Sequence, residues 1–198
     1  MYGCLLGYNS ISAEMGDAQL KALVEKIGYV EGMPVVVDPK ILSPMDFIRE
    51  VIEQRLPNPF IPDMPQRIAT DTSQKVPIRF GETIKSYMAR PDLDASELKY
   101  VPLALAGWLR YLLAVDDRGE AFCCSSDPML EVLQKQLASV KPGDPASATE
   151  EALKPILSNP ALFAVDLYEA GLAGKVTGYL KKMLTGPGAV RATLEELV

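Results

Sequence analysis

The chain has 198 residues, of which 48% are hydrophobic and 23% are charged, and its formal net charge is −6. This is ample apolar material for a core, and no long run of basic residues offers the clustered Lys and Arg that nucleic-acid binding needs. The longest apolar stretches fall far short of the roughly 20 residues of a membrane-spanning helix. No basic segment typical of a signal peptide opens the chain. We therefore expect a cytoplasmic protein with neither a nucleic-acid nor a membrane partner.

Histidine is absent from the sequence. This excludes serine–histidine triads, cysteine–histidine dyads and histidine-ligated zinc. The three cysteines, two of them adjacent at Cys123 and Cys124, fit neither a disulfide framework nor the usual zinc-ligand spacing. The glycines assemble neither GxGxxG nor a P-loop. We expect no metal site and no nucleotide-binding loop in this chain.

Helix signals begin early in the chain. Asp17 is expected to cap a helix that ends at Gly28. Ser43 followed by Pro44 predicts a second helix start, and apolar residues then recur at helical spacing until Pro57. The first ten residues are apolar from the start, which fits either a helix continued from upstream or an ordinary buried N-terminal helix. Strand signal is nearly absent, with 35–37 the only β-branched run.

The second half of the chain is also helical in pattern. Asp94 precedes a long apolar segment, 98–115, which predicts a central buried helix whose start Pro102 delays or kinks. Trp108 and Tyr111 are expected in its core. Further helices are predicted after Asp127-Pro128, after Asn159-Pro160, over 172–184 and over 189–197, with 141–148 a polar loop. The sequence therefore predicts an all-α fold over residues 1–198.

Four charged residues fall four apart: Arg67, Asp71, Lys75 and Arg79. A run of short polar residues, 71–73, is a poor helix interior and predicts a break or a new N-cap there. The three cations would then converge from two helical segments and a turn, where they suit a carboxylate or the hydroxyls of a sugar acid. Ser73 would add a backbone N–H for an anion.

The same spacing has a plainer interpretation, a salt ladder along one solvated helix face. Each pair of such a ladder contributes about 0.2–0.5 kcal/mol. The spacing alone favours the ladder, because regular charge spacing on exposed helices is often incidental.

The stretch NPFIPDMPQRIATDTSQKVPIRFGETI, residues 58–84, resembles the signature of the C-terminal domain of the mannitol dehydrogenase family. The shared features are the NP start, an RI-x-x-D step, and S-x-K followed by a second arginine. Further matches are PLALAGWLRYLL (102–113), SDP (126–128) and GPGAVRATLEEL (186–197). The resemblance covers essentially the whole chain. It is greatest to the fructuronate reductase (D-mannonate oxidoreductase) branch, with mannitol 2-dehydrogenase as the alternative.

The resemblance implies a two-domain, NAD-dependent oxidoreductase that transfers hydride without a metal. An N-terminal Rossmann-type domain would bind NAD, and residues 1–198 would form the helical substrate-side domain. In the family, a lysine acts as acid/base while an asparagine and a histidine polarise the reacting oxygen. These three residues precede the segment that matches Tyr2–Tyr8, so no catalytic residue is expected in this chain and the chain alone should be inactive.

The resemblance also bears on the charged segment. Arg67 and Lys75 match family positions that reach the substrate, Asp71 and Ser73 match the turn between them, and Arg79 is a further candidate. With the family included, the substrate-site interpretation is favoured over the salt ladder. The alternative from another class is a non-catalytic helical interaction module. A helical domain without its partner domain should also expose apolar surface and self-associate.

Overall fold

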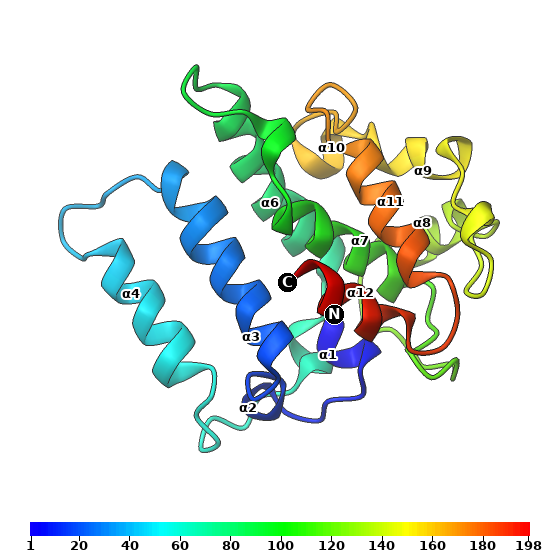
Figure 1. Ribbon diagram of the computed structural model, residues 1–198, viewed down its shortest axis with the longest axis horizontal. Helices are drawn as coiled ribbons and strands as arrows, with labels where there is room; N and C mark the ends of the chain where they lie inside the picture. The colour runs from blue at the N-terminus through cyan, green and yellow to red at the C-terminus, as the bar shows by residue number, and fades with distance from the viewer.

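The computed structural model describes residues 1–198 as an assembly of helices without a sheet (Figure 1). Only two isolated β-bridges occur, 115 with 121 and 141 with 144. The α-helices are α1 (Tyr2–Leu5), α2 (Ile11–Glu14), α3 (Ala18–Glu25), α4 (Pro44–Glu50), α5 (Pro65–Ile68), α6 (Thr72–Met88), α7 (Tyr100–Leu112), α8 (Leu130–Gln136), α9 (Glu150–Leu157), α10 (Pro160–Phe163), α11 (Ala173–Met183) and α12 (Ala189–Leu197). Two π-helices, η1 (Lys26–Gly32) and η3 (Val51–Arg55), and three short 3₁₀ helices, η2 (Met33–Val35), η4 (Ala95–Glu97) and η5 (Pro145–Ser147), complete the chain. The all-α prediction is confirmed. None of the helices is both long and apolar enough to cross a lipid bilayer.

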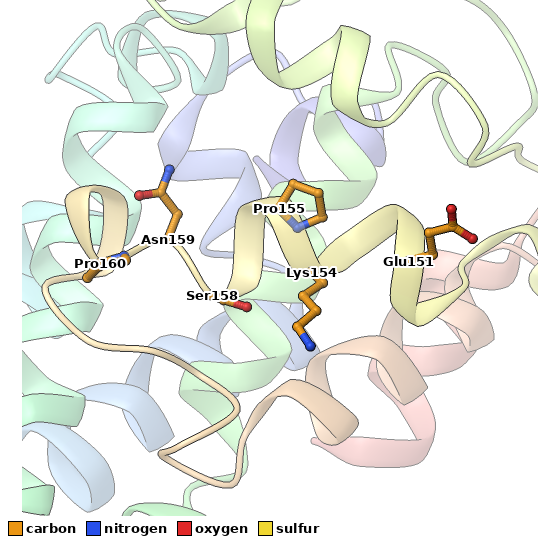
Figure 2. A pocket seen from close by; sticks show the side chains of 6 residues that line it. All are labelled: Glu151, Lys154, Pro155, Ser158, Asn159 and Pro160. Carbon is orange, nitrogen blue, oxygen red and sulfur yellow. The ribbon is translucent and has the colours of Figure 1, made fainter.

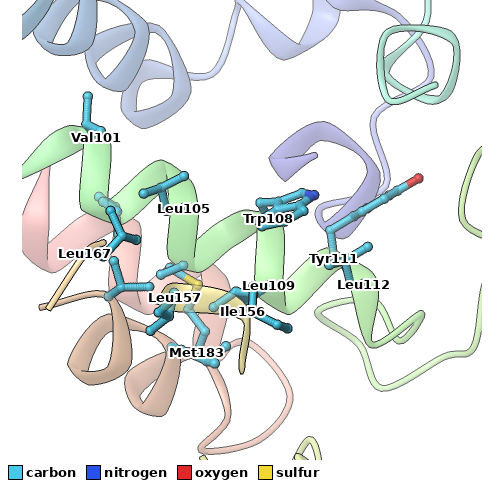
Figure 3. Close-up of a cluster of buried hydrophobic side chains, with 14 of the residues drawn as sticks. Val101, Leu105, Trp108, Leu109, Tyr111, Leu112, Ile156, Leu157, Leu167 and Met183 are labelled. Atoms are coloured by element: carbon cyan, nitrogen blue, oxygen red, sulfur yellow. The ribbon is translucent and has the colours of Figure 1, made fainter. Parts of the chain in front are cut away.

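The central helix is α7, as predicted. Twelve of its thirteen residues are buried, and Figure 3 shows its leucines packed against side chains of α9 and α11. Pro102 lies in the first turn, where backbone N–H groups have no acceptor within the helix. The helix therefore starts late, at Tyr100, instead of kinking. Asp94 caps the short η4 through the Ser96 N–H at 2.8 Å.

Two helices start against carboxylates that come from far away in the sequence. Glu31, buried beside α7, accepts the backbone N–H groups of residues 99, 100 and 101 at 2.5, 2.8 and 2.6 Å. Asp117 accepts those of Val190 and Arg191, at the start of α12, at 2.7 and 3.1 Å. Each carboxylate satisfies donors that a helix start leaves free and favours the positive end of the helix dipole.

The N-terminal third forms a hairpin of α3 and α4, with α4 at the edge of the molecule (Figure 1). Asp17 caps α3 as predicted. The prediction that this helix ends at Gly28 is wrong, because the chain continues as η1 through Gly32. Gly28 instead permits close packing, since a Cβ there would lie 2.4 Å from Ile48 Cδ1. A small cluster centred on Ile52, separate from the main core, holds the hairpin together.

The later helix starts are mostly as predicted. Asn159 caps α10 through the Ala161 N–H at 3.0 Å, but α10 ends at Phe163 because Ala164 adopts a left-handed backbone, with φ 60°. The helices predicted over 172–184 and 189–197 are α11 and α12. After Asp127, helix α8 starts only at Leu130.

Candidate functional site

The charged segment breaks where the short polar residues predict it. Helix α5 ends at Ile68 and α6 begins at Thr72, with Asp71 between them in the left-handed region at φ 55°, ψ 40°. Few non-glycine residues adopt this conformation, and Asp is among the side chains that tolerate it. The Asp71 N–H donates to the carbonyl oxygen of Ser126 at 2.8 Å. The single continuous helix that a salt ladder requires is therefore absent.

The start of α6 is capped by Asp127. The Thr72 hydroxyl and the Ser73 backbone N–H donate to one oxygen of this carboxylate at 2.9 and 2.7 Å, and the Ser73 hydroxyl donates to the other. Burial acts to raise the pKa of Asp127, but these hydrogen bonds outweigh it and hold the pKa below its ordinary value. Because its N–H is used in this way, Ser73 does not offer it to a substrate anion. That part of the prediction is wrong.

Lys75 and Arg79 line one cavity of about 230 Å³. The Lys75 ammonium also donates to the Thr70 carbonyl at 2.5 Å, which folds the side chain back over the turn. The other lining residues are Met1, Ile68, Ala69, Thr72, Val76 and Phe80. No acidic residue lines this cavity, so two cations share an otherwise apolar wall with a single hydroxyl.

Arg67 does not line the cavity. Its guanidinium forms a two-point ion pair with Asp63, in which Nε donates at 2.5 Å. The hydrogen bond from Arg67 lowers the pKa of the Asp63 carboxyl. The Arg67 side chain is 66% exposed and the Asp63 side chain is 18% exposed, so the guanidinium stays accessible to solvent while it is paired. The structure thus brings Lys75 and Arg79 together, whereas Arg67 faces its own carboxylate partner.

A larger, more open hollow lies elsewhere, along α9 and at its C-terminal end. It has a volume of about 530 Å³ and is lined by six residues between Glu151 and Pro160 (Figure 2). Its only charged residues, Glu151 and Lys154, have opposite signs, and Lys154 lies 3.9 Å from Glu150. The Ser158 Oγ is buried there without a hydrogen-bond partner. Because this cavity gathers no group of convergent charge, we place the candidate site at the smaller cavity beside α6.

Sequence reasoning missed two contributors to the candidate site. Thr72 lines the cavity and accepts a hydrogen bond from the Trp108 indole N–H at 3.1 Å. Asp127 was interpreted as the start of a later helix, and no local pattern links it to Ser73, 54 positions earlier. The SDP match to the family, residues 126–128, was the only signal that could have pointed to it.

The mannitol dehydrogenase C-terminal domain family matches residues 1–184, and the chain belongs to this family of oxidoreductases. The predicted resemblance is thereby confirmed. The chain is 59% identical over 198 residues to D-mannonate oxidoreductase of Thermotoga maritima, a match that covers all of this chain and 36% of that protein. It is 27% identical over 182 residues to D-mannonate oxidoreductase of Escherichia coli, covering 91% of this chain and 35% of the relative.

A solved structure shares the fold. The ternary complex of Pseudomonas fluorescens mannitol 2-dehydrogenase with NAD and D-mannitol matches with a TM-score of 0.75 and 21% identity, over 98% of this chain and 36% of that one. The chain therefore spans little more than a third of the length of the proteins it matches.

Proposed function

We propose that residues 1–198 form the substrate-side domain of an NAD-dependent oxidoreductase that interconverts D-mannonate and D-fructuronate. The observation that carries the proposal is the cavity in which Lys75 and Arg79 meet with no acidic residue beside them. Both sugars are carboxylates, and an arginine fork together with an ammonium group is a favourable environment for a carboxylate. The name of the relative at 59% identity, D-mannonate oxidoreductase, supports the same substrate pair.

Each residue has a proposed role in holding the substrate. Lys75 and Arg79 bind the carboxylate, and the Thr72 hydroxyl, which lines the same wall, contacts a sugar hydroxyl. Arg67 binds a further oxygen of the substrate through the guanidinium nitrogen that does not pair with Asp63. Asp71 contributes its backbone conformation, which directs α6 away from α5. The volume of about 230 Å³ suits a ligand smaller than a drug molecule.

The residues of this chain do not form a dinucleotide site of the Rossmann type. A dinucleotide site of the Rossmann type needs parallel strands and a glycine-rich turn at a helix start, and neither occurs in these 198 residues. We therefore propose that a separate N-terminal Rossmann-type domain holds NAD, and we assign no chemical step to this chain alone. NADH and D-fructuronate added to the chain should show no loss of NADH absorbance, and sustained turnover would contradict this division of labour.

Binding to the isolated chain tests the site. We expect D-mannonate to shift amide NMR signals of residues 68–80, and D-mannitol, which has no carboxylate, to bind more weakly. Replacing one cation, as in Lys75→Met or Arg79→Gln, should weaken D-mannonate binding by about tenfold, because it removes a charge-assisted hydrogen bond.

The matched control is Lys181→Met, the same change at an exposed position on α11. It should leave D-mannonate binding unchanged. Equal binding of D-mannitol and D-mannonate would redirect the proposal to a polyol substrate. No response to either ligand would leave the non-catalytic interaction module as the better proposal.

A further inference from the structure

We infer that Asp127 is a positioning residue of this site, which acts on the substrate through Lys75 by holding the turn between α5 and α6. The inference rests on the proposed function. Asp127 does not line the cavity beside α6. Its effect would be transmitted through the backbone of residues 71–73 to the side chain two residues further along α6.

The Asp127 carboxylate is fully engaged with protein donors. It accepts the Thr72 hydroxyl, the Ser73 N–H, the Ser73 hydroxyl and, at 3.0 Å, the Met129 N–H. A carboxylate has about four acceptor positions, so none remains for a ligand or a metal. Holding the start of α6 is the role that this geometry leaves.

The turn needs such a hold because Asp71 lies in a conformation that a non-glycine residue adopts at a cost. Two consecutive residues of another segment oppose its relaxation. The Ser126 carbonyl accepts the Asp71 N–H, and the Asp127 carboxylate accepts the next donors along the chain. From the turn thus fixed, Lys75 reaches back to the Thr70 carbonyl and lines the cavity.

Without the Asp127 cap, the turn has a well-defined alternative. Relaxation of Asp71 into the right-handed region would join α5 to α6 in one helix. Asp71 and Lys75 would then be neighbours at i and i+4, and the carboxylate of one would neutralise the ammonium of the other. With the Asp127 cap, the charged segment forms a turn beside a cation-lined site. Without it, the segment would form a continuous helix with a salt ladder.

The protein carries a natural reporter of this network. Trp108, the one tryptophan of the chain, donates its indole N–H to Thr72 Oγ1, whose own hydroxyl donates to Asp127. The indole N–H signal is therefore expected to respond to a change at Asp127 and, because Thr72 lines the cavity, to ligand binding.

The experiment compares three variants of the chain by amide NMR, at a temperature where circular dichroism shows each to be folded. Asp127→Ala removes the cap. Asp127→Asn keeps the contacts with α6 and loses only the one with Met129, because the amide oxygen can accept the Ser73 N–H and the Thr72 hydroxyl while its NH₂ donates to the Ser73 hydroxyl. Asp117→Ala is the matched control, since it removes another carboxylate that caps a helix from afar, at α12. Should Asp127→Ala fail to fold, Ser73→Ala removes only one of the contacts.

We expect Asp127→Ala to displace the Trp108 indole and Lys75 signals and to weaken D-mannonate binding about tenfold or more, as loss of a supporting contact does at other sites. Asp127→Asn and Asp117→Ala should bind within about threefold of the parent chain. If Asp127→Ala and Asp117→Ala lose D-mannonate affinity equally, or if neither loses any, the positioning role is overturned while the proposed substrate stands. If the parent chain binds no sugar, the proposed function fails, and unmoved Lys75 and indole signals in Asp127→Ala would then overturn the positioning role separately.

Discussion

Among single residues, Asp17 connects three separate parts of the chain. One of its oxygens accepts the backbone N–H groups of residues 19 and 20 at 3.0 and 3.1 Å. The other accepts the Tyr8 hydroxyl at 2.6 Å and pairs with the Arg191 guanidinium. One carboxylate thus ties the start of α3 to α12. Burial acts to raise the pKa of Asp17, but the hydrogen bonds from Arg191 and Tyr8 outweigh it and lower the pKa to about 2.

This lowered pKa predicts a specific dependence of stability on pH. A carboxyl whose pKa is lower in the folded than in the unfolded chain stabilises the fold above the unfolded value, here close to 3.8. That contribution, on the order of 2 kcal/mol, is lost as the pH falls from about 4 through about 2. Urea unfolding should therefore show a gap in unfolding free energy between the parent chain and Asp17→Asn at neutral pH that closes in this acid range.

The control for this prediction is Asp38→Asn. The pKa of Asp38 is also lowered, by the hydrogen bonds from Lys40, but this carboxylate lies on the exposed surface. Its replacement should change stability little at any pH. A gap for Asp17→Asn that stays constant down to pH values near 2 would contradict the assignment.

Between elements, helices α6 and α10 approach each other closely at Gly81. A Cβ on Gly81 would lie 1.8 Å from the carbonyl oxygen of Phe163, so only glycine fits where the two backbones meet. Gly178, on the exposed side of α11, is the opposite case, because nothing lies within 4 Å of its added Cβ.

The two glycines predict opposite outcomes for the same substitution. Gly81→Ala should destabilise the protein by about 3 kcal/mol or more, because a backbone carbonyl would have to move. Gly178→Ala should stabilise it by about 1 kcal/mol, because alanine favours a helix interior over glycine. Thermal or urea unfolding of both variants measures the difference. Similar effects from the two changes would mean that α6 and α10 do not touch as described.

Elements whose start or burial is set by neighbouring residues could be predicted from the sequence. Elements that depend on contacts with distant segments could not. The start of α4 at Ser43 and the burial of α7 follow from residues adjacent to them. The π-helical continuation past Gly28 has no such local signal, and Gly28 packs closely against Ile48, twenty residues further along the chain. At the site, the break near Asp71 was predictable from its short polar neighbours, but its cap from Asp127 was not. The pairing of Arg67 with Asp63 was not predicted, although Asp63 lies four residues before Arg67 and continues the same four-residue spacing of charges.

At the scale of the whole molecule, exposed apolar side chains concentrate in one third of the chain. The most exposed are Val37, Ile41 and Phe60, at 86%, 93% and 91%. Met64, just before α5, and Ile68, at its end, are about half exposed, and Ile68 borders the candidate site. Where exposed apolar side chains adjoin one another, they are typical of surfaces that another protein surface covers.

We expect the isolated chain to self-associate through these residues. Sedimentation velocity should show an average mass that rises with protein concentration. The double variant Ile41→Lys/Phe60→Lys should reduce that rise without loss of helix content, whereas Lys135→Ala on α8 should not. A chain that stays monomeric at all accessible concentrations would contradict this expectation.

The remote helix caps also bear on the order in which the protein can take shape as it leaves the ribosome. Glu31 has already been synthesised when α7 emerges, and Asp117 precedes α12. The capping carboxylate of each of these helices is therefore available as soon as the helix emerges. Helix α6 is the exception, because its cap is Asp127, which is translated 54 residues after Ser73. On the nascent chain, the start of α6 should therefore lack its cap, and the wall of the candidate site should lack a fixed conformation, until the central helix and Asp127 have emerged.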